Sequence, residues 1–265
     1  MTEGLDLDAY LARIGYEGEL HPTPETLAGL HRAHALTIPF ENLDILLGRP
    51  ILLDLPSLQA KLVDGRRGGY CFEQNSLFAG VLEHLGFAVT RLAARVRMGD
   101  ARQNPRTHMA LAVDLGETRW LADVGFGAEG LLDPLPFGVD APVRQSSWTY
   151  RLDGEGDLFV VRSLHGDGWV DLYAFDLQPQ LPVDSEMANH YTSTSPRSSF
   201  VKHVTVQRPG PDERLVLWER SFVVQRGEGE ERIDVRGSEQ LLQILRDRFG
   251  LVFPEGTRFP LGERS

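Results

Sequence analysis

The stretch RRGGYCFEQN, residues 66–75, holds the single cysteine of the 265-residue chain, Cys71. Two glycines before it, Gly68 and Gly69, allow the backbone to turn tightly. Apolar residues in segment 71–85 then recur at helical spacing, with Gly86 as a stop signal. We therefore expect Cys71 at the start of a helix, where unpaired N–H groups and the helix dipole favour an anion. The reactive form of cysteine is the thiolate, so Cys71 is a candidate nucleophile, although an inert buried cysteine fits the same pattern.

The rest of the chain divides into three regions around this segment. Residues 1–86 are predicted to be mostly helical, with one helix ending near Gly15 and another stopping before Pro39. In 87–195 the apolar period changes to two, which predicts a β-rich region with turns at Gly116-Glu117 and at 153–156. Residues 196–265 are predicted to form strands, beginning with FVKHVTVQ, and a final helix capped by Ser238. The fold class is therefore α+β.

Length, charge and cysteine content limit the classes of function. A chain of 265 residues exceeds the size, roughly 250 residues, at which single cores stop growing. Its net charge of −11 argues against nucleic-acid and anionic-membrane partners but is compatible with a small anionic ligand in a local basic pocket. One cysteine forms no intramolecular disulfide, and we see no secretory signal or membrane span, so we expect a cytoplasmic protein.

A predicted hairpin supplies two partners for the thiol. THMALAVDL and TRWLADVGF flank Gly116-Glu117, and a two-residue loop there places Leu115 opposite Thr118. In that register His108 and Asp123 are diagonal neighbours on one face. A slip of one residue would separate them, and each is also a plausible structural residue taken alone. With Cys71 they form the nucleophile, base and orienting group of covalent catalysis.

Other candidate sites are less developed in the sequence. His31 and His34 lie one helical turn apart and could bind a metal, but no third ligand stands at metal-site spacing. We therefore predict no metal. Neither a dinucleotide-binding fingerprint nor a P-loop is present, so a nucleotide-bearing cosubstrate would have to bind in another way.

Five segments, in order along the chain, carry a resemblance to one family. They are TIPFENLDI at 37–45, RGGYCFEQN at 67–75, THMALAV at 107–113, LADVGFG at 121–127 and NHYTSTSP at 189–196. On these strings the chain resembles the arylamine N-acetyltransferases. The resemblance implies a helical bundle at 1–86, an antiparallel β-barrel at 87–195 and an α/β lid at 196–265, around a Cys-His-Asp core like that of cysteine proteases.

The resemblance also implies the reaction and its residues. Acetyl-CoA would donate the acetyl group, and an arylamine, arylhydrazine or N-arylhydroxylamine would accept it. Cys71, His108 and Asp123 would form the catalytic triad. Phe40, Phe126 and Phe200 would line the acceptor cleft, and Thr107 and Gly127 would lie near the cosubstrate.

Three alternatives remain open at this point. A cysteine hydrolase or transglutaminase-like enzyme would use a triad in the same chain order. An amide synthase, which releases a carrier-bound chain in a biosynthetic pathway, has the same core motifs. A non-catalytic binding module could keep the fold alone. The natural acceptor, the length of the acyl donor, CoA contacts in 201–236 and the oligomeric state do not follow from the sequence.

Overall fold

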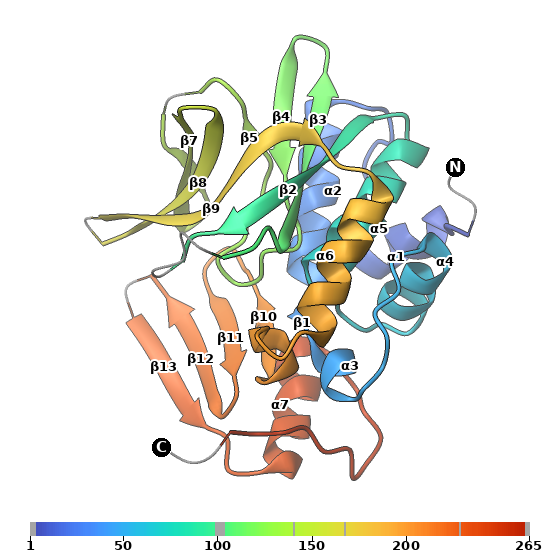
Figure 1. Cartoon of the computed structure of the whole chain (residues 1–265), viewed down its shortest axis with the longest axis vertical. Helices are drawn as coiled ribbons and strands as arrows, with labels where there is room; N and C mark the ends of the chain where they lie inside the picture. The colour runs from blue at the N-terminus through green and yellow to red at the C-terminus, as the bar shows by residue number, and fades with distance from the viewer. Residues whose placement is uncertain (1–3, 99–103, 140, 167, 228, 263–265) are drawn as a thin grey trace.

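The computed structural model describes residues 4–98, 104–139, 141–166, 168–227 and 229–262. Figure 1 shows helices from the first third of the chain beside an eight-stranded sheet, and a five-stranded sheet below both. Within the described residues no helix combines the length and the apolar character needed to span a membrane.

The first third of the chain is helical, as its periodicity predicts. Asp6 and Thr23 cap the first two helices by accepting hydrogen bonds from backbone N–H groups. The first helix ends at Gly15 in the left-handed conformation, which glycine adopts without strain. The elements are α1 (Leu7–Ile14), α2 (Pro24–Thr37), α3 (Leu43–Leu46), α4 (Leu55–Leu58), the π-helix η1 (Gln59–Asp64) and α5 (Cys71–His84).

An antiparallel sheet of eight strands follows, in the order β5-β4-β3-β2-β9-β8-β7-β6. Its β3–β4 hairpin projects at the top of Figure 1 and has Leu115 opposite Thr118, so the predicted register is confirmed. The strands are β2 (Ala88–Val96), β3 (His108–Leu115), β4 (Thr118–Ala122), β5 (Leu135–Pro136), β6 (Val143–Gln145), β7 (Trp148–Glu155), β8 (Leu158–His165) and β9 (Gly168–Pro179).

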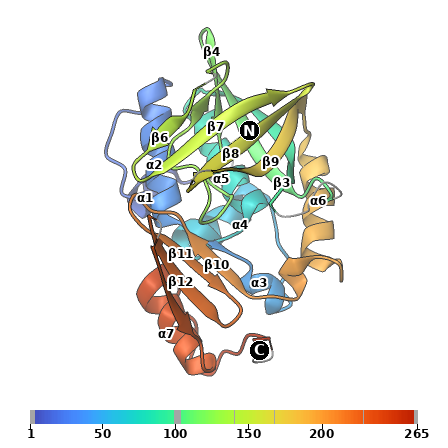
Figure 2. The same ribbon diagram turned by 90° about the vertical axis from the view of Figure 1, so that its left-hand side faces the viewer.

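The second sheet combines distant parts of the chain. A short strand from the helical third, β1, pairs with β10 and occupies the edge of an otherwise C-terminal sheet. The last helix, α7, packs its buried leucines and Phe249 against this sheet. Figure 2 shows α7 covering it on one side. The elements are β1 (Phe40–Glu41), β10 (Thr205–Arg208), β11 (Arg214–Trp218), β12 (Ser221–Arg226), β13 (Gly229–Asp234) and α7 (Ser238–Phe249).

The connection between the two sheets is helical. Helix α6 (Pro182–Thr194) follows β9 and runs down toward the five-stranded sheet, and the short 3₁₀-helix η2 (Ser199–Val201) follows it. Asn189 of α6 accepts a hydrogen bond from the hydroxyl of Tyr70, the residue that directly precedes Cys71. This segment therefore ties the start of α5 to both sheets.

Several local predictions differ from the structure. Residues Asp153 to Glu155 belong to β7, because the tight turn lies further on, where Glu155 pairs with Leu158. Ser238 is the first residue of α7, and Gly237 takes the N-cap position without a side-chain bond. The strand expected from Phe200 begins only at Thr205, because η2 occupies the preceding residues.

Candidate active site

Cys71 is the first residue of α5, and its side chain is buried. The two glycines before it do not serve the purpose that the sequence suggested. We expected Gly68 and Gly69 to make a tight turn, but neither residue has a positive φ. Both glycines instead permit close packing: a Cβ on Gly68 would lie 2.1 Å from the carbonyl oxygen of Pro39, and one on Gly69 would contact the side chain of Glu73. The helix start is thus fixed against β1 and its own first turn.

Glu73 holds the first turn of α5 in place. Its Oε2 accepts a hydrogen bond from the Tyr70 backbone N–H (3.1 Å), and its Oε1 pairs with the Lys61 Nζ at 2.6 Å. Such a bond satisfies one backbone group that a helix start leaves without an intrahelical partner. The remaining N–H groups of this turn lie beside Cys71.

His108 and Asp123 meet across the hairpin, as its register predicts. His108 is the first residue of β3, and Asp123 directly follows the last residue of β4. The His108 Nε2 donates to the Asp123 Oδ2 at 2.7 Å, and both side chains are almost fully buried, at 3% and 1% exposure. Because Nε2 is used in this way, Nδ1 is the imidazole nitrogen left for Cys71.

Electrostatics favour a charged pair at this position. Burial alone would lower the pKa of His108, but the Asp123 charge, its hydrogen bond and hydrogen bonding with Cys71 outweigh burial and raise that pKa to about 10. Burial would raise the pKa of Asp123, yet the charge and hydrogen bonds of His108, Asn75 and the Gly125 backbone hold it below its usual value. The imidazolium is therefore the stable form of His108 at neutral pH.

Asn75 orients the carboxylate, and the sequence reasoning did not single it out. Its Nδ2 donates to the Asp123 Oδ1 at 2.9 Å and to the Met109 carbonyl oxygen at 2.7 Å, and its Oδ1 accepts from the Val124 N–H. Gly125 follows, where a Cβ would lie 2.8 Å from the Cys71 Cα. Helical spacing could have indicated this role, because Asn75 lies one turn after Cys71 and therefore on the same face of the helix.

His31 and His34 have structural partners. The His31 Nε2 accepts from the Asp123 backbone N–H at 3.0 Å, and its Nδ1 donates to the Leu132 carbonyl oxygen at 3.0 Å. His34 lies between the Tyr10 hydroxyl and the Gln74 Oε1. Their ring nitrogens are thus occupied, and the described residues contain no cluster of three or more histidine, cysteine, aspartate or glutamate side chains suited to a metal.

Aromatic rings pack against the imidazole. Tyr173 from β9 lies with its ring centroid 4.7 Å from that of His108, and Phe126 lies 5.1 Å away on an edge-to-face contact. Such packing restricts the rotation of the imidazole and excludes water from the pair. Tyr173 stands in the segment WVDLYAF, whose strand pattern indicates burial without identifying a partner.

A cavity of about 220 Å³ opens onto this cluster. Cys71 and His108 line it, together with the three predicted phenylalanines, Phe40, Phe126 and Phe200, and with Thr107. The Cys71 Sγ lies 3.5 Å from the Thr107 carbonyl oxygen. Gly127 is not among the described lining residues; it adopts a positive φ of 93° beside the side chain of Gln207.

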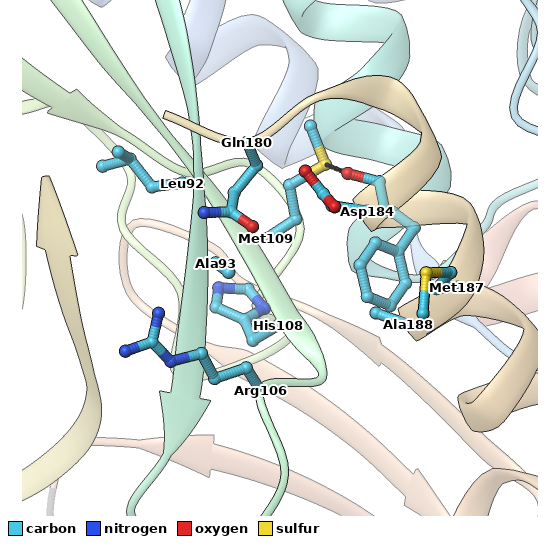
Figure 3. A pocket seen from close by; sticks show the side chains of 11 residues that line it. Leu92, Ala93, Arg106, His108, Met109, Gln180, Asp184, Met187 and Ala188 are labelled. Atoms are coloured by element: carbon cyan, nitrogen blue, oxygen red, sulfur yellow. Dashed lines mark hydrogen bonds between the residues drawn. The ribbon is translucent and has the colours of Figure 1, made fainter. Parts of the chain in front are cut away.

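Two further cavities adjoin the site. One of about 270 Å³ shares Val96, Thr107 and Phe200 with the first and has Arg197 in its wall. The other, of about 300 Å³, has His108 but not Cys71 among its lining residues. Figure 3 shows this cavity between Ala93 of β2 and Met187 of α6.

Comparisons with known proteins agree with this arrangement. A family model described as N-acetyltransferase matches residues 23–257. An arylamine N-acetyltransferase / N-hydroxyarylamine O-acetyltransferase of Salmonella typhimurium is 40% identical over 248 residues, covering 92% of this chain and 88% of the relative. The solved arylamine N-acetyltransferase of Nocardia farcinica superposes with a TM-score of 0.90 at 42% identity, covering 96% of this chain and 92% of that one.

A third relative was solved with a ligand. The Mycobacterium marinum arylamine N-acetyltransferase in complex with CoA has a TM-score of 0.88 and 38% identity, covering 92% of each chain. The fold and sequence thus define an N-acetyltransferase of this architecture. The chain belongs to the arylamine N-acetyltransferase family. The resemblance seen in the five sequence segments is confirmed.

Proposed function

We propose that this protein transfers the acetyl group of acetyl-CoA to an arylamine, arylhydrazine or N-arylhydroxylamine, through a thioester on Cys71. The contact that carries the proposal is the buried His108–Asp123 hydrogen bond, because His108 lines the same cavity as Cys71. The names of the relatives support arylamine and N-arylhydroxylamine acceptors, and the M. marinum complex with CoA supports the donor.

In the first half-reaction, the Cys71 thiolate attacks the carbonyl carbon of the acetyl thioester. A bond forms between Sγ and that carbon, and the bond to the CoA sulfur breaks. His108 gives its Nδ1 proton to the leaving thiolate, so CoA departs as a thiol. The first N–H groups of α5 are positioned by the helix start to stabilise the oxyanion of the tetrahedral intermediate.

In the second half-reaction, the acceptor nitrogen or oxygen attacks the acetyl-Cys71 carbonyl. His108, now neutral, takes the proton that the acceptor loses, and the Cys71 thiolate leaves. Asp123 keeps the imidazole in the orientation in which Nδ1 faces Cys71. Two easier steps replace one difficult step, and ping-pong kinetics follow.

The cavity walls agree with these substrates. Phe40, Phe126 and Phe200 present aromatic surface beside Cys71, which suits an arylamine ring. The adjoining cavity shares Thr107 and contains Arg197, a side chain well suited to bind phosphate oxygens of the donor. We assign Gly127 to the approach of the cosubstrate, because its backbone lies beside Gln207, which lines the Cys71 cavity.

The same proposal covers the organisation and location of the protein. We assign residues 1–86 to a helical bundle that carries the nucleophile, 87–195 to a barrel that carries His108 and Asp123, and 196–265 to a lid. The pairing of β1 with β10, which joins the C-terminal segment to the helical third, supports placing the lid against the bundle. A single cysteine supports a reducing, cytoplasmic location.

The test is the intact mass of the protein after incubation with acetyl-CoA and no acceptor. We expect a gain of one acetyl group, which an added aromatic amine removes. Cys71→Ala is the matched control and should show no gain. If the wild type also gains nothing while iodoacetamide still alkylates Cys71, the donor is a different acyl group, such as a carrier-bound chain, and the acetyl-transfer assignment is wrong.

A further inference from the structure

Glu129 is the only carboxylate among the described residues that line the cavity with Cys71. No lysine or arginine is among those residues, and apart from Cys71, His108 and Glu129 the wall consists of apolar and neutral polar residues. A negative charge in such a wall is costly to bury and is expected to act on whatever occupies the space. Glu129 takes no part in either of the two half-reactions.

The carboxylate of Glu129 is held firmly from behind. Its Oε1 accepts from the Arg214 guanidinium at 2.9 Å, and its Oε2 lies 3.1 Å from the His165 Nε2. Arg214 is itself 1% exposed, lies over the Trp148 ring at 3.7 Å and donates to the Tyr150 hydroxyl. The side chain of Glu129 therefore has little freedom to turn away from its position.

This arrangement leaves the carboxylate able to act on a ligand. A carboxylate accepts roughly four hydrogen bonds, and within the described part of the chain Glu129 has two such partners, Arg214 and His165. Arg214 does not line the cavity, so an occupant meets Glu129 before it meets the balancing positive charge. In the acetyl-enzyme, the ionisable side chains in the described wall are therefore the Glu129 carboxylate and the His108 imidazole, and of these only Glu129 contributes negative charge.

We propose that Glu129 selects the acceptor by charge. Acceptors with an anionic group on the ring, such as a carboxylate, are disfavoured, and acceptors with a cationic or hydrogen-bond-donating group are favoured. This inference rests on the proposed function and specifies the substrate class of the same site.

The test uses the discharge of preformed acetyl-Cys71 by three anilines. These are 4-aminobenzoate, its neutral methyl ester, and (4-aminobenzyl)trimethylammonium, which is a permanent cation with the aniline nitrogen as its one nucleophilic amine. Each second-order rate constant is divided by that of the same aniline with a simple acetyl thioester in water, which corrects for nucleophilicity. In the wild type we expect the corrected values to rise from the anion to the ester to the cation.

Glu129→Gln should reduce the differences among the three corrected rate constants. We expect the anion-to-ester ratio to rise about 3- to 10-fold and the cation-to-ester ratio to fall by a similar factor, as for charges several ångströms apart at intermediate dielectric. Arg214→Met removes the balancing positive charge and should increase the differences among the three corrected rate constants. The double variant Glu129→Gln/Arg214→Met removes both charges, so that no buried arginine is left without a partner.

The outcomes separate this inference from the proposed function. Absence of acetyl-Cys71 in the wild type would refute the function itself. Formation of acetyl-Cys71 with equal corrected rates for the three anilines would overturn only the role of Glu129, even if every variant failed to fold. Ratios that stay unchanged in folded Glu129→Gln or in the folded double variant would overturn it as well.

Discussion

Two cavities meet at His108, and they differ in chemistry more than in size. The larger, of about 300 Å³, has no cysteine among its lining residues, and the hydroxyl that it does contain, on Ser185, lies beside the Met109 sulfur. Its Arg106 is paired with Asp176, and its Asp184 accepts a bond from the Leu181 N–H. The smaller, of about 220 Å³, has Cys71 and three phenylalanines in its wall. The comparison teaches that reactive groups, and not volume, identify the candidate site.

The largest expected effect is at Cys71, the proposed nucleophile. Cys71→Ala should reduce acetyl transfer on the order of 10⁶-fold, because residues of a catalytic triad act as a unit. Steady-state turnover of an arylamine with acetyl-CoA measures this, with circular dichroism as the control for folding. Substantial turnover by the folded variant would mean that Cys71 does not identify the smaller cavity as the active site.

A smaller loss is expected at the orienting carboxylate. Asp123→Asn should keep the fold and lower turnover roughly 10³- to 10⁴-fold, because an amide stabilises the wrong imidazole tautomer. His108→Gln is the companion variant, in which iodoacetamide should alkylate Cys71 more slowly near neutral pH. Near-normal turnover of Asp123→Asn would exclude Asp123 from the triad.

A matched pair of tryptophans compares the cavities directly. Val96 and Ala93 both lie on β2, the first in the wall of the Cys71 cavity and the second in the wall of the larger one. Val96→Trp should lower kcat/KM on the order of 100-fold by displacing the substrate. Ala93→Trp should change it by about twofold or less, as for substitutions away from special features. Equal losses would mean that both cavities serve the reaction.

The smallest effect concerns stability and pH. The folded protein raises the pKa of His108 from 6.5 to about 10, so binding of this proton stabilises the fold fully below about pH 6.5. That stabilisation declines as the pH rises toward about 10. The difference in melting temperature between the wild type and His108→Gln should therefore narrow over this range. A constant difference would contradict the raised pKa.

The sequence was sufficient to predict the geometry of the β3–β4 hairpin, because the type and length of a turn determine which residues of the two strands lie opposite each other. A two-residue turn at Gly116 sets the register, and the register brings His108 and Asp123 together. Helix ends such as Gly15 follow from capping rules of the same local kind. The placement of Cys71 at the start of α5 belongs to this class.

Contacts between elements that are distant in the sequence could not be predicted in this way. The spacing of His31 indicates a buried helix face, but nothing in it identifies the Asp123 backbone, 92 residues away, as the partner. Tyr173 likewise stands in a strand with an ordinary buried pattern. The strand β1 is too short, at two residues, for any period to show. Tertiary packing decides each of these, and a single sequence does not contain it as a local signal.

The pairing of β1 with β10 has a consequence for synthesis of the protein on the ribosome. Phe40 pairs with Gln207, so the wall of the cavity cannot be completed until the chain has grown far beyond Cys71. At translation rates of 5–20 residues per second, the nascent chain carries its thiol for roughly 7–27 seconds before β10 is made. During that interval the cysteine lacks its finished surroundings, and protection of the thiol depends on the reducing state of the cell.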